Sequence, residues 1–249
     1  IGLKSALREH AYDYVNLTVG SSRHQIQTVT LAGITWMQFN ARSRDLEDQI
    51  YLIDGASVEY MYENNWLTTV GGLFQWGRMY MYTPWLSGLN NAGEQTQDKP
   101  WVMESHVPCP DGYRVPTYRE LKTILPDSLT IPGSHTVNGE TIDITLHRSG
   151  LQPAAINGVS VNARYLKLTS QQTGNSLFIP LSGYKWDKST TTNPQFGHGF
   201  VLWSNEYHSG GYSNAVRYWP GNNVTSAVMS ANYRLPAESF SYVRCVKSE

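Results

Sequence analysis

The chain has 249 residues, and its 19 basic and 20 acidic side chains give a formal net charge of −1. This balance, without a visible basic stripe, argues against a nucleic-acid partner, and no apolar run approaches the roughly 18 residues that span a bilayer. Eight Trp, sixteen Tyr and a charged fraction of only 16% favour an extracellular binding protein over a cytosolic enzyme. Because the sequence starts at Ile1 rather than Met, either maturation removed the front or the chain is a piece of a longer protein.

The first elements in chain order are predicted strands. Within residues 1–30, "YDYVNLTVG" and the start of "QIQTVTL" alternate and are rich in β-branched side chains. They are predicted either to end an upstream domain or to form an edge of this one. "GITWMQFN" is predicted as a further strand, and "ASVEYMYENNWL" as a short helix that Ser57 caps.

The clearest local signal is "PTYRELKTIL". Thr117 and Glu120 have the spacing of a capping box, in which each side chain binds a free backbone N–H at the helix start. Leu121, Ile124 and Leu125 form the predicted buried stripe. The pattern predicts a helix that Pro126 ends.

Two Asn-Gly pairs then stand between alternating segments, at Asn138-Gly139 and Asn157-Gly158. This dipeptide is the strongest short-range signal for a β-hairpin. "SLFIPLSGYKW" is predicted as a further strand and "SYVRCVK" as the closing strand. Without a linker or an internal repeat, the pattern predicts a single α+β domain.

Catalytic constellations are missing from the sequence. It contains no HExxH pair, no GxSxG elbow, no phosphate loop and no CxxC pair. The seven histidines do not fall at metal-ligand spacing. We therefore expect no catalytic residue, no metal site and no cofactor.

The two cysteines, Cys109 and Cys245, lie far apart in sequence. They are either two buried reduced thiols or a disulfide that closes a long loop. We prefer the disulfide, which would indicate an oxidising compartment.

Six blocks occur in a characteristic order: "GITWMQFNAR", "GGLFQWGRMY", "CPDGYRVPTYREL", "IPLSGYKW", "GFVLWSNEY" and "SYVRCVK". Together they resemble the Fibrobacter succinogenes major paralogous domain family of secreted and surface proteins, which is common in the Bacteroidetes. The resemblance covers residues 31–249, with an added pair of hairpins at about 127–180. It implies that Cys109 pairs with Cys245.

The resemblance also implies a variant of the C-type lectin-like fold, related to the formylglycine-generating-enzyme type. Such a domain has two helices, a small antiparallel sheet in which the chain termini meet, and long irregular loops and hairpins. We expect Arg78 and Arg114 to order the loop region by binding backbone carbonyls. Trp36, Trp76 and Tyr113 are expected in the core.

In this fold the segment 203–233 would supply the ligand-facing loops. Its Tyr and Trp offer contact area for few rotatable bonds, and its Ser, Gly and Asn adapt their hydrogen bonds. Trp203 and Trp219 are as well explained as core anchors. The predicted exposed, ligand-binding set is Asn205, Tyr207, His208, Tyr212, Asn214, Arg217, Tyr218, Asn222, Asn223, Asn232 and Tyr233.

Calcium is a weaker alternative in the same segment. "WSN" at 203–205 is similar to the "WND" of calcium-dependent lectins, but only Glu206 adds a nearby carboxylate, and calcium needs several oxygen ligands.

The resemblance implies a non-catalytic surface or fimbria-associated adhesin, located outside the cell or on its outer surface, that binds a glycan or a protein. A structural pilus or surface-assembly subunit is one alternative, and a variable protein of a diversity-generating retroelement is another. An enzyme of the formylglycine-generating type would need a pair of active-site cysteines, which a disulfide would remove.

Overall fold

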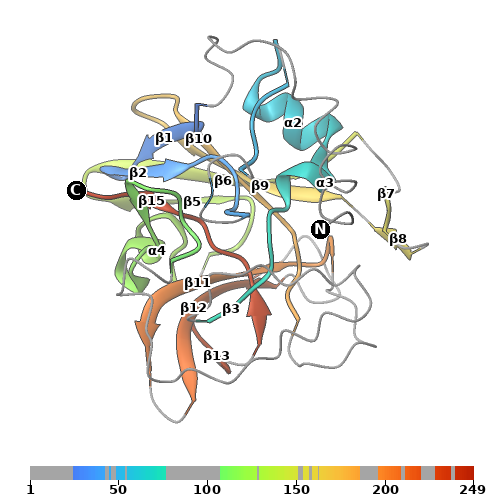
Figure 1. Cartoon of the computed structure of the whole chain (residues 1–249). Coiled ribbons are helices and arrows are strands. Elements are labelled where there is room, and N and C mark those ends of the chain that lie inside the picture. The colour runs from blue at the N-terminus through green and yellow to red at the C-terminus, as the bar shows by residue number, and fades with distance from the viewer. Residues whose placement is uncertain are drawn as a thin grey trace.

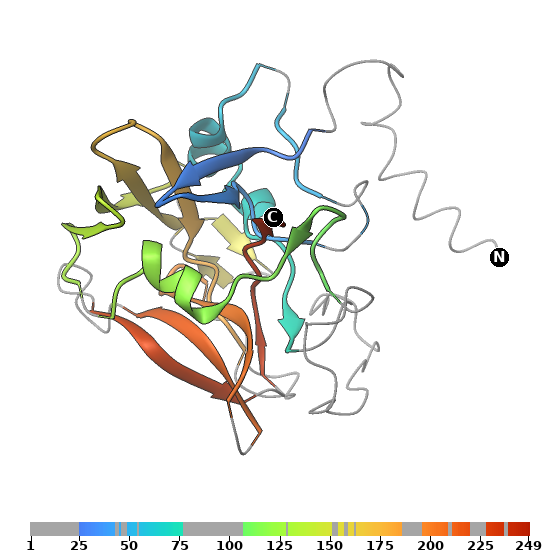
Figure 2. The same ribbon diagram turned by 90° about the vertical axis from the view of Figure 1, so that its left-hand side faces the viewer.

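The computed structural model describes residues 25–42, 45, 49–53, 55–76, 107–127, 129–150, 154–156, 159–161, 163–185, 196–208, 211–219, 228–236 and 239–249. These residues form three helices and several small sheets of mostly antiparallel strands. Together they make one mixed α+β arrangement (Figures 1 and 2). Predictions for residues 1–24, Arg78, the Asn157-Gly158 turn, Asn222 and Asn223 lie outside the described residues. Within those residues, no helix is both long and apolar enough to cross a membrane.

One sheet joins the start of the described chain to its end. Its strands, in spatial order, are β1 (Thr28–Leu31), β2 (Ile34–Met37), β15 (Val246–Lys247) and β4 (Tyr113–Arg114). The late strand β15 therefore lies between two earlier strands (Figure 1). Two further backbone hydrogen bonds extend this contact, from the Met37 amide to the Cys245 carbonyl and from the Ala41 amide to the Val243 carbonyl.

A second sheet contains the predicted hairpins. Its strands, in spatial order, are β10 (Ser176–Pro180), β9 (Arg164–Ser170), β6 (Glu140–Arg148) and β5 (Gly133–Val137). Asn138 and Gly139 join β5 to β6 with φ angles of 51° and 77°, as a two-residue hairpin turn requires. The strands β7 (Ala154–Ile156) and β8 (Val159–Val161) form a separate pair.

The two predicted helices are confirmed. Helix α2 (Val58–Asn64) begins at Ser57, whose hydroxyl accepts a hydrogen bond from the Tyr60 amide. The short α3 (Trp66–Thr69) follows directly. Helix α4 (Tyr118–Ile124) begins with the predicted capping box of Thr117 and Glu120.

The segment predicted as ligand-facing loops is largely a three-stranded antiparallel sheet, which corrects that prediction. Its strands are β11 (Phe200–Tyr207), β12 (Tyr212–Trp219) and β13 (Val228–Pro236), drawn in orange in Figure 1. β3 (Phe74–Gln75) pairs with β14 (Phe240–Ser241), and β14 contacts β11. The predicted closing strand "SYVRCVK" is divided between β14 and β15.

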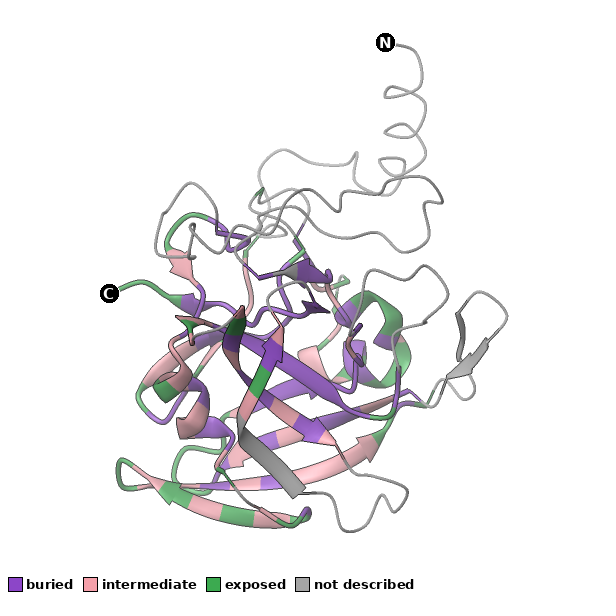
Figure 3. Cartoon of the chain, turned by 90° about the horizontal axis from the view of Figure 1, so that it is seen from below, coloured by how far each residue is buried: buried purple, intermediate pink, exposed green. Residues whose placement is uncertain are grey.

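Two large apolar clusters fill the interior of the described part, and a third, compact cluster contains Phe39, Tyr62, Tyr165 and Phe178. The two large clusters differ in size. The larger includes Ile144 and Leu168 from the second sheet together with Trp36 from β2, so the hairpins at 133–180 contribute to the main core. The smaller surrounds Trp76, Trp203 and the cysteines. Most buried segments run through the middle of Figure 3, and most exposed segments lie toward its periphery. Trp36 and Trp76 are buried as expected, and Tyr113 is half-buried.

Two covalent and polar links hold the C-terminal segment in place. Cys109 and Cys245 form the predicted disulfide, which is consistent with a location outside the reducing cytoplasm. The fully buried Arg244 donates hydrogen bonds to the Asn40 Oδ1 atom at 3.0 Å, the Met37 carbonyl at 3.0 Å and the Tyr62 hydroxyl at 3.3 Å. The Tyr62 hydroxyl also contacts the carbonyls of Gln38 and Phe178. This arginine network ties β2, α2 and β10 to the segment before β15.

Candidate functional site

The predicted ligand-binding residues lie on both faces of the β11–β13 sheet rather than on one exposed face. Successive side chains of a strand point to opposite faces. Arg217 therefore shares a face with Ala215, which packs in the smaller core cluster, whereas Asn214 shares the opposite face with Val216 of the larger cluster. The side chain of Asn232, in β13, lies outside the described part of the chain, as do Asn222 and Asn223.

Tyr218 is fully buried, which corrects its predicted exposure. Its ring stacks on Phe200 with centroids 5.6 Å apart inside the larger core cluster. Burial raises the pKa of the Tyr218 hydroxyl to about 12, although the charge of Arg164 opposes this effect. Tyr218 lies on the face of β12 that packs in the larger cluster, whereas Arg217 and Trp219 lie on the face of Ala215. Composition alone could not assign these side chains to one face or the other.

Arg217 lies at the centre of an aromatic group that we call the Arg217 cluster: Tyr184, Arg217, Trp219 and Tyr233. The guanidinium carbon of Arg217 is 4.3 Å from the centroid of the Tyr233 ring, a cation–π geometry. Tyr184 makes edge contacts with the rings of Trp219 and Tyr233, at 5.8 Å and 6.5 Å. The four side chains are half-buried, so they are ordered by each other and still reach solvent.

The indole ring of Trp219 also packs against a neighbouring backbone segment. An added Cβ at Gly199 would lie 2.6 Å from its Cε3 atom, so the indole ring packs directly on the backbone of Gly199. The Nε of Arg217 is buried and has no hydrogen-bond partner among the described residues. The cluster therefore presents rigid aromatic rings around a cation that lacks a carboxylate partner in the described part of the chain.

A second group lies at the tip of the β11–β12 hairpin. Tyr207 and Tyr212 are 37% and 42% exposed. Tyr207 contacts the Trp76 ring at 5.6 Å, and its hydroxyl accepts a hydrogen bond from the Gly211 amide. His208 donates its backbone amide to the Tyr212 carbonyl. Along a strand of eight residues, this tip lies roughly 23 Å from Trp219.

Glu206 joins this hairpin to helix α4. One carboxylate oxygen accepts a hydrogen bond from the Tyr118 amide at 3.0 Å, and the other accepts one from Asn214 Nδ2 at 3.3 Å. The backbone amide of Asn205 binds the Pro116 carbonyl, while its Oδ1 is buried without a partner. Both carboxylate oxygens of Glu206 are thus used in hydrogen bonds within the domain. The described residues contain no group of three or more His, Cys, Asp or Glu side chains that could hold a metal ion.

Arg114 binds a carboxylate rather than the backbone carbonyls that we expected. Its two terminal nitrogens donate to the two Glu120 oxygens at 2.8 Å and 2.6 Å. Glu120 also accepts from the Thr117 amide at 2.7 Å. Burial raises the pKa of Glu120. The hydrogen bonds from Arg114 and Thr117 and the positive charge of Arg114 outweigh this effect, so the pKa lies below its usual 4.5.

This lowered pKa predicts a pH-dependent contribution to stability. A carboxylate with a lower pKa in the folded state stabilises the protein above the unfolded-state value and loses that contribution as the pH falls through the folded-state value. We expect Glu120→Gln to cost about 1 kcal/mol near neutral pH, and the difference from the wild type to shrink below pH 4.5. Urea unfolding at a series of pH values measures this difference, and a difference that grows on acidification would contradict the assignment.

The fold and this site define a disulfide-tied α+β domain with a polar and aromatic late sheet. Comparison with known families matches the Fibrobacter succinogenes major domain over residues 29–247. The chain therefore belongs to this family, as the order of its sequence blocks predicted. Neither the comparison with curated proteins nor the comparison with solved structures gives a match.

Sequence reasoning missed some residues of this site. Tyr184 lies before the late segment and reaches the cluster through its ring contacts with Trp219 of β12 and Tyr233 of β13. Trp219 was equally well explained as a core anchor. The available signal was its spacing: Trp219 stands two residues after Arg217 in a strand, so the two side chains share a face.

Proposed function

We propose that this domain is a non-catalytic binding module of a secreted or cell-surface protein, and that the Arg217 cluster binds a glycan. The observation that carries the proposal is the arrangement of three partly exposed aromatic rings around one arginine. Aromatic side chains contribute a large contact area at low conformational cost. Arginine adds several hydrogen-bond donors for hydroxyl or carboxylate oxygens.

The geometry favours preorganised binding. Edge contacts fix Tyr184, the ring of Tyr233 lies under the guanidinium, and Trp219 packs on the Gly199 backbone. Burial, assisted by a hydrogen bond with Tyr184, raises the pKa of Tyr233, so its hydroxyl stays protonated at neutral pH. Rings that are already ordered lose little entropy when a ligand binds.

The fold offers two further points of support. The early strands β1 and β2 and the late strand β15 share one sheet, as a C-type lectin-like domain requires, and we propose that relationship for this chain. The disulfide occupies the two cysteines of the sequence, which leaves no thiol for chemistry of the formylglycine-generating type. A binding role outside the cell is in keeping with both.

A glycan array with the full 249-residue chain tests this proposal, repeated with a chelator. We expect chelator-resistant binding. Trp219→Ala should weaken it by about 30-fold or more, because truncating a central aromatic contact typically costs at least about 2 kcal/mol. Arg217→Met should also weaken binding.

Two further tyrosine variants test whether the Arg217 cluster is the glycan-binding surface. Tyr60→Ala removes a tyrosine that is 48% exposed on α2, away from the cluster, and should leave affinity unchanged. Tyr212→Ala removes a tyrosine at the hairpin tip. If Tyr212→Ala abolishes binding and Trp219→Ala does not, the site lies at the tip and the proposal for the Arg217 cluster is wrong.

A further inference from the structure

Two arginines face each other at the ends of adjacent strands in the second sheet. Arg148 ends β6, Arg164 begins β9, and the two are register partners in the antiparallel pair. Register partners point to the same face of a sheet. That face is the apolar one, because the same alternation places Leu166 and Leu168 in the larger core cluster. Like charges directly opposite each other destabilise a sheet. A negatively charged group bound between the two arginines would remove this cost.

Neither arginine has an acidic partner within the described part of the chain. Arg148 and Arg164 take part in no ion pair there, and the Nε of Arg164 is buried without a hydrogen-bond partner. Burial lowers the pKa of Arg164, the adjacent charge of Arg148 lowers it further, and only the Tyr218 hydroxyl acts in the opposite direction. That hydroxyl is itself buried without a partner.

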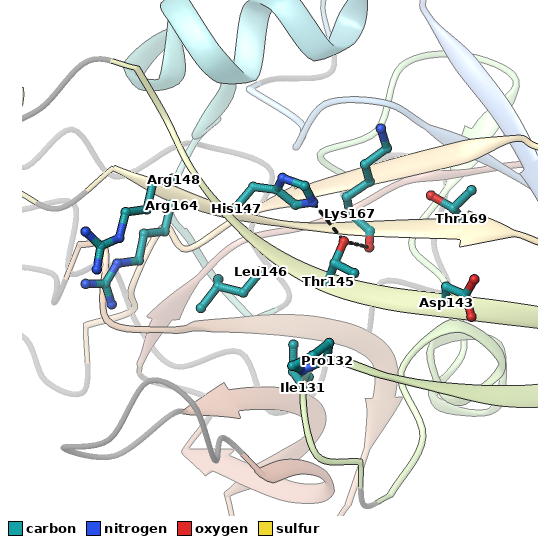
Figure 4. Close-up of a pocket in the computed structure, with 10 residues that line it drawn as sticks. All are labelled: Ile131, Pro132, Asp143, Thr145, Leu146, His147, Arg148, Arg164, Lys167 and Thr169. Carbon is teal, nitrogen blue, oxygen red and sulfur yellow. Dashed lines mark hydrogen bonds between the residues drawn. The ribbon is translucent and has the colours of Figure 1, made fainter.

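The pair borders an open hollow of about 710 Å³ at this end of the sheet. Figure 4 shows the two guanidinium groups together at one end of the hollow, beyond Leu146, with Ile131 and Pro132 below. The hollow thus combines cationic donors with an apolar wall, the usual make-up of a small-molecule site.

The other charged groups of the hollow are already engaged. Lys167 binds the Glu59 carboxylate at 2.7 Å, and Asp143 accepts a hydrogen bond from Gln171 at 2.9 Å. His147 binds the Thr145 hydroxyl (Figure 4). Its pKa is lowered by burial and by the charge of Lys167, so it adds no permanent charge near neutral pH. The Gln171 amide leaves the charge of Asp143 in place, but Asp143 lies at the opposite end of the hollow from the two arginines (Figure 4). Arg148 and Arg164 are therefore the cations of the hollow that lack an acidic partner in the described part of the chain.

We propose that Arg148 and Arg164 bind one oxyanion, a carboxylate, sulfate or phosphate group carried by a small ligand such as an acidic sugar. Planar guanidinium forks match such groups with paired hydrogen bonds. The bound anion neutralises the repulsion between the two arginines, and the apolar wall of Ile131, Pro132 and Leu146 accommodates the body of the ligand. This site is separate from the Arg217 cluster and does not depend on the proposed function.

Calorimetric titration of the full chain with four probes tests the site: glucuronate, glucose 6-sulfate, glucose 6-phosphate and glucose. We expect at least one anionic sugar to bind and to raise the melting temperature, glucose to do neither, and salt to weaken binding. The ranking of the three anionic sugars identifies the preferred group. If none of them binds more tightly than glucose, the proposal is wrong.

The variants separate this site from general electrostatics. Arg148→Gln, at an exposed position, should fold normally, raise the melting temperature of the free protein by relieving repulsion, and weaken the anionic sugar about tenfold or more. Arg148→Lys should recover only part of the affinity. Arg119→Gln removes the same charge from an exposed position of α4 and should change neither quantity. Equal affinity in the wild type and in the Arg148→Gln/Arg164→Gln double variant would overturn the proposal.

Discussion

Reduction of the Cys109–Cys245 disulfide is expected to lower the free energy of unfolding by about 5 kcal/mol. The bond closes a loop of 136 residues, and in the chain-entropy description a cross-link of this length restricts the unfolded chain strongly. Both cysteines are buried in the smaller core cluster beside Trp76 and Trp203, so reduction leaves the apolar contacts in place. Urea unfolding with and without a reductant measures the loss.

A double variant provides the control for this experiment. Cys109→Ala/Cys245→Ala should unfold at nearly the urea concentration of the reduced protein and should not respond to the reductant. If titration shows both thiols free and the unfolding midpoint has not moved, the stabilising role of the bond is refuted.

Replacement of Arg244 by methionine should cost about 3 to 5 kcal/mol. The change leaves the Asn40 side-chain oxygen and the Met37 carbonyl without their donor in a buried site, and each unsatisfied buried group costs about 1–3 kcal/mol. The Tyr62 hydroxyl loses its third contact. Arg244→Lys should recover little, because an ammonium group cannot reproduce the guanidinium geometry.

A control substitution and a double-mutant cycle test whether the loss of stability comes from the Arg244 hydrogen bonds. Arg119→Met, on the exposed side of α4, should change stability by less than about 0.5 kcal/mol. A double-mutant cycle with Tyr62→Phe should show a coupling energy above about 0.5 kcal/mol, as expected for residues in one hydrogen-bond network. Additive effects of the two substitutions would mean that the arginine network is not energetically connected.

Short sequence motifs correctly predicted the elements that depend on interactions between residues close in sequence. The capping box at Thr117 and the Asn138-Gly139 turn depend on bonds within a few residues, and both occur as predicted. The disulfide followed from the family's pattern of blocks. The role of Arg244 could not be predicted, because its partners lie about 180 to 210 residues away along the chain and no spacing rule connects them.

In the segment 203–233, residue composition gave a wrong prediction of loops. Its Asn, Ser and Tyr are residues that also occur in loops, and they concealed strands that bury about half of their side chains, such as Ala215, Val216 and Tyr218 in β12. Ser204, for example, is fully buried there, and its hydroxyl donates a hydrogen bond to the Asn214 carbonyl. Side chains that bind backbone groups can occupy interior positions that composition assigns to solvent. The predicted single surface was therefore divided between two faces.

The position of β15 between β2 and β4 has a consequence for biosynthesis. A nascent chain cannot close this sheet, form the cross-link at Cys245 or satisfy Asn40 through Arg244 until residues 244–247 have emerged. The domain must therefore mature only after its synthesis is nearly finished. Late closure of this kind is compatible with passage through an export channel before folding, and with formation of the disulfide in an oxidising compartment.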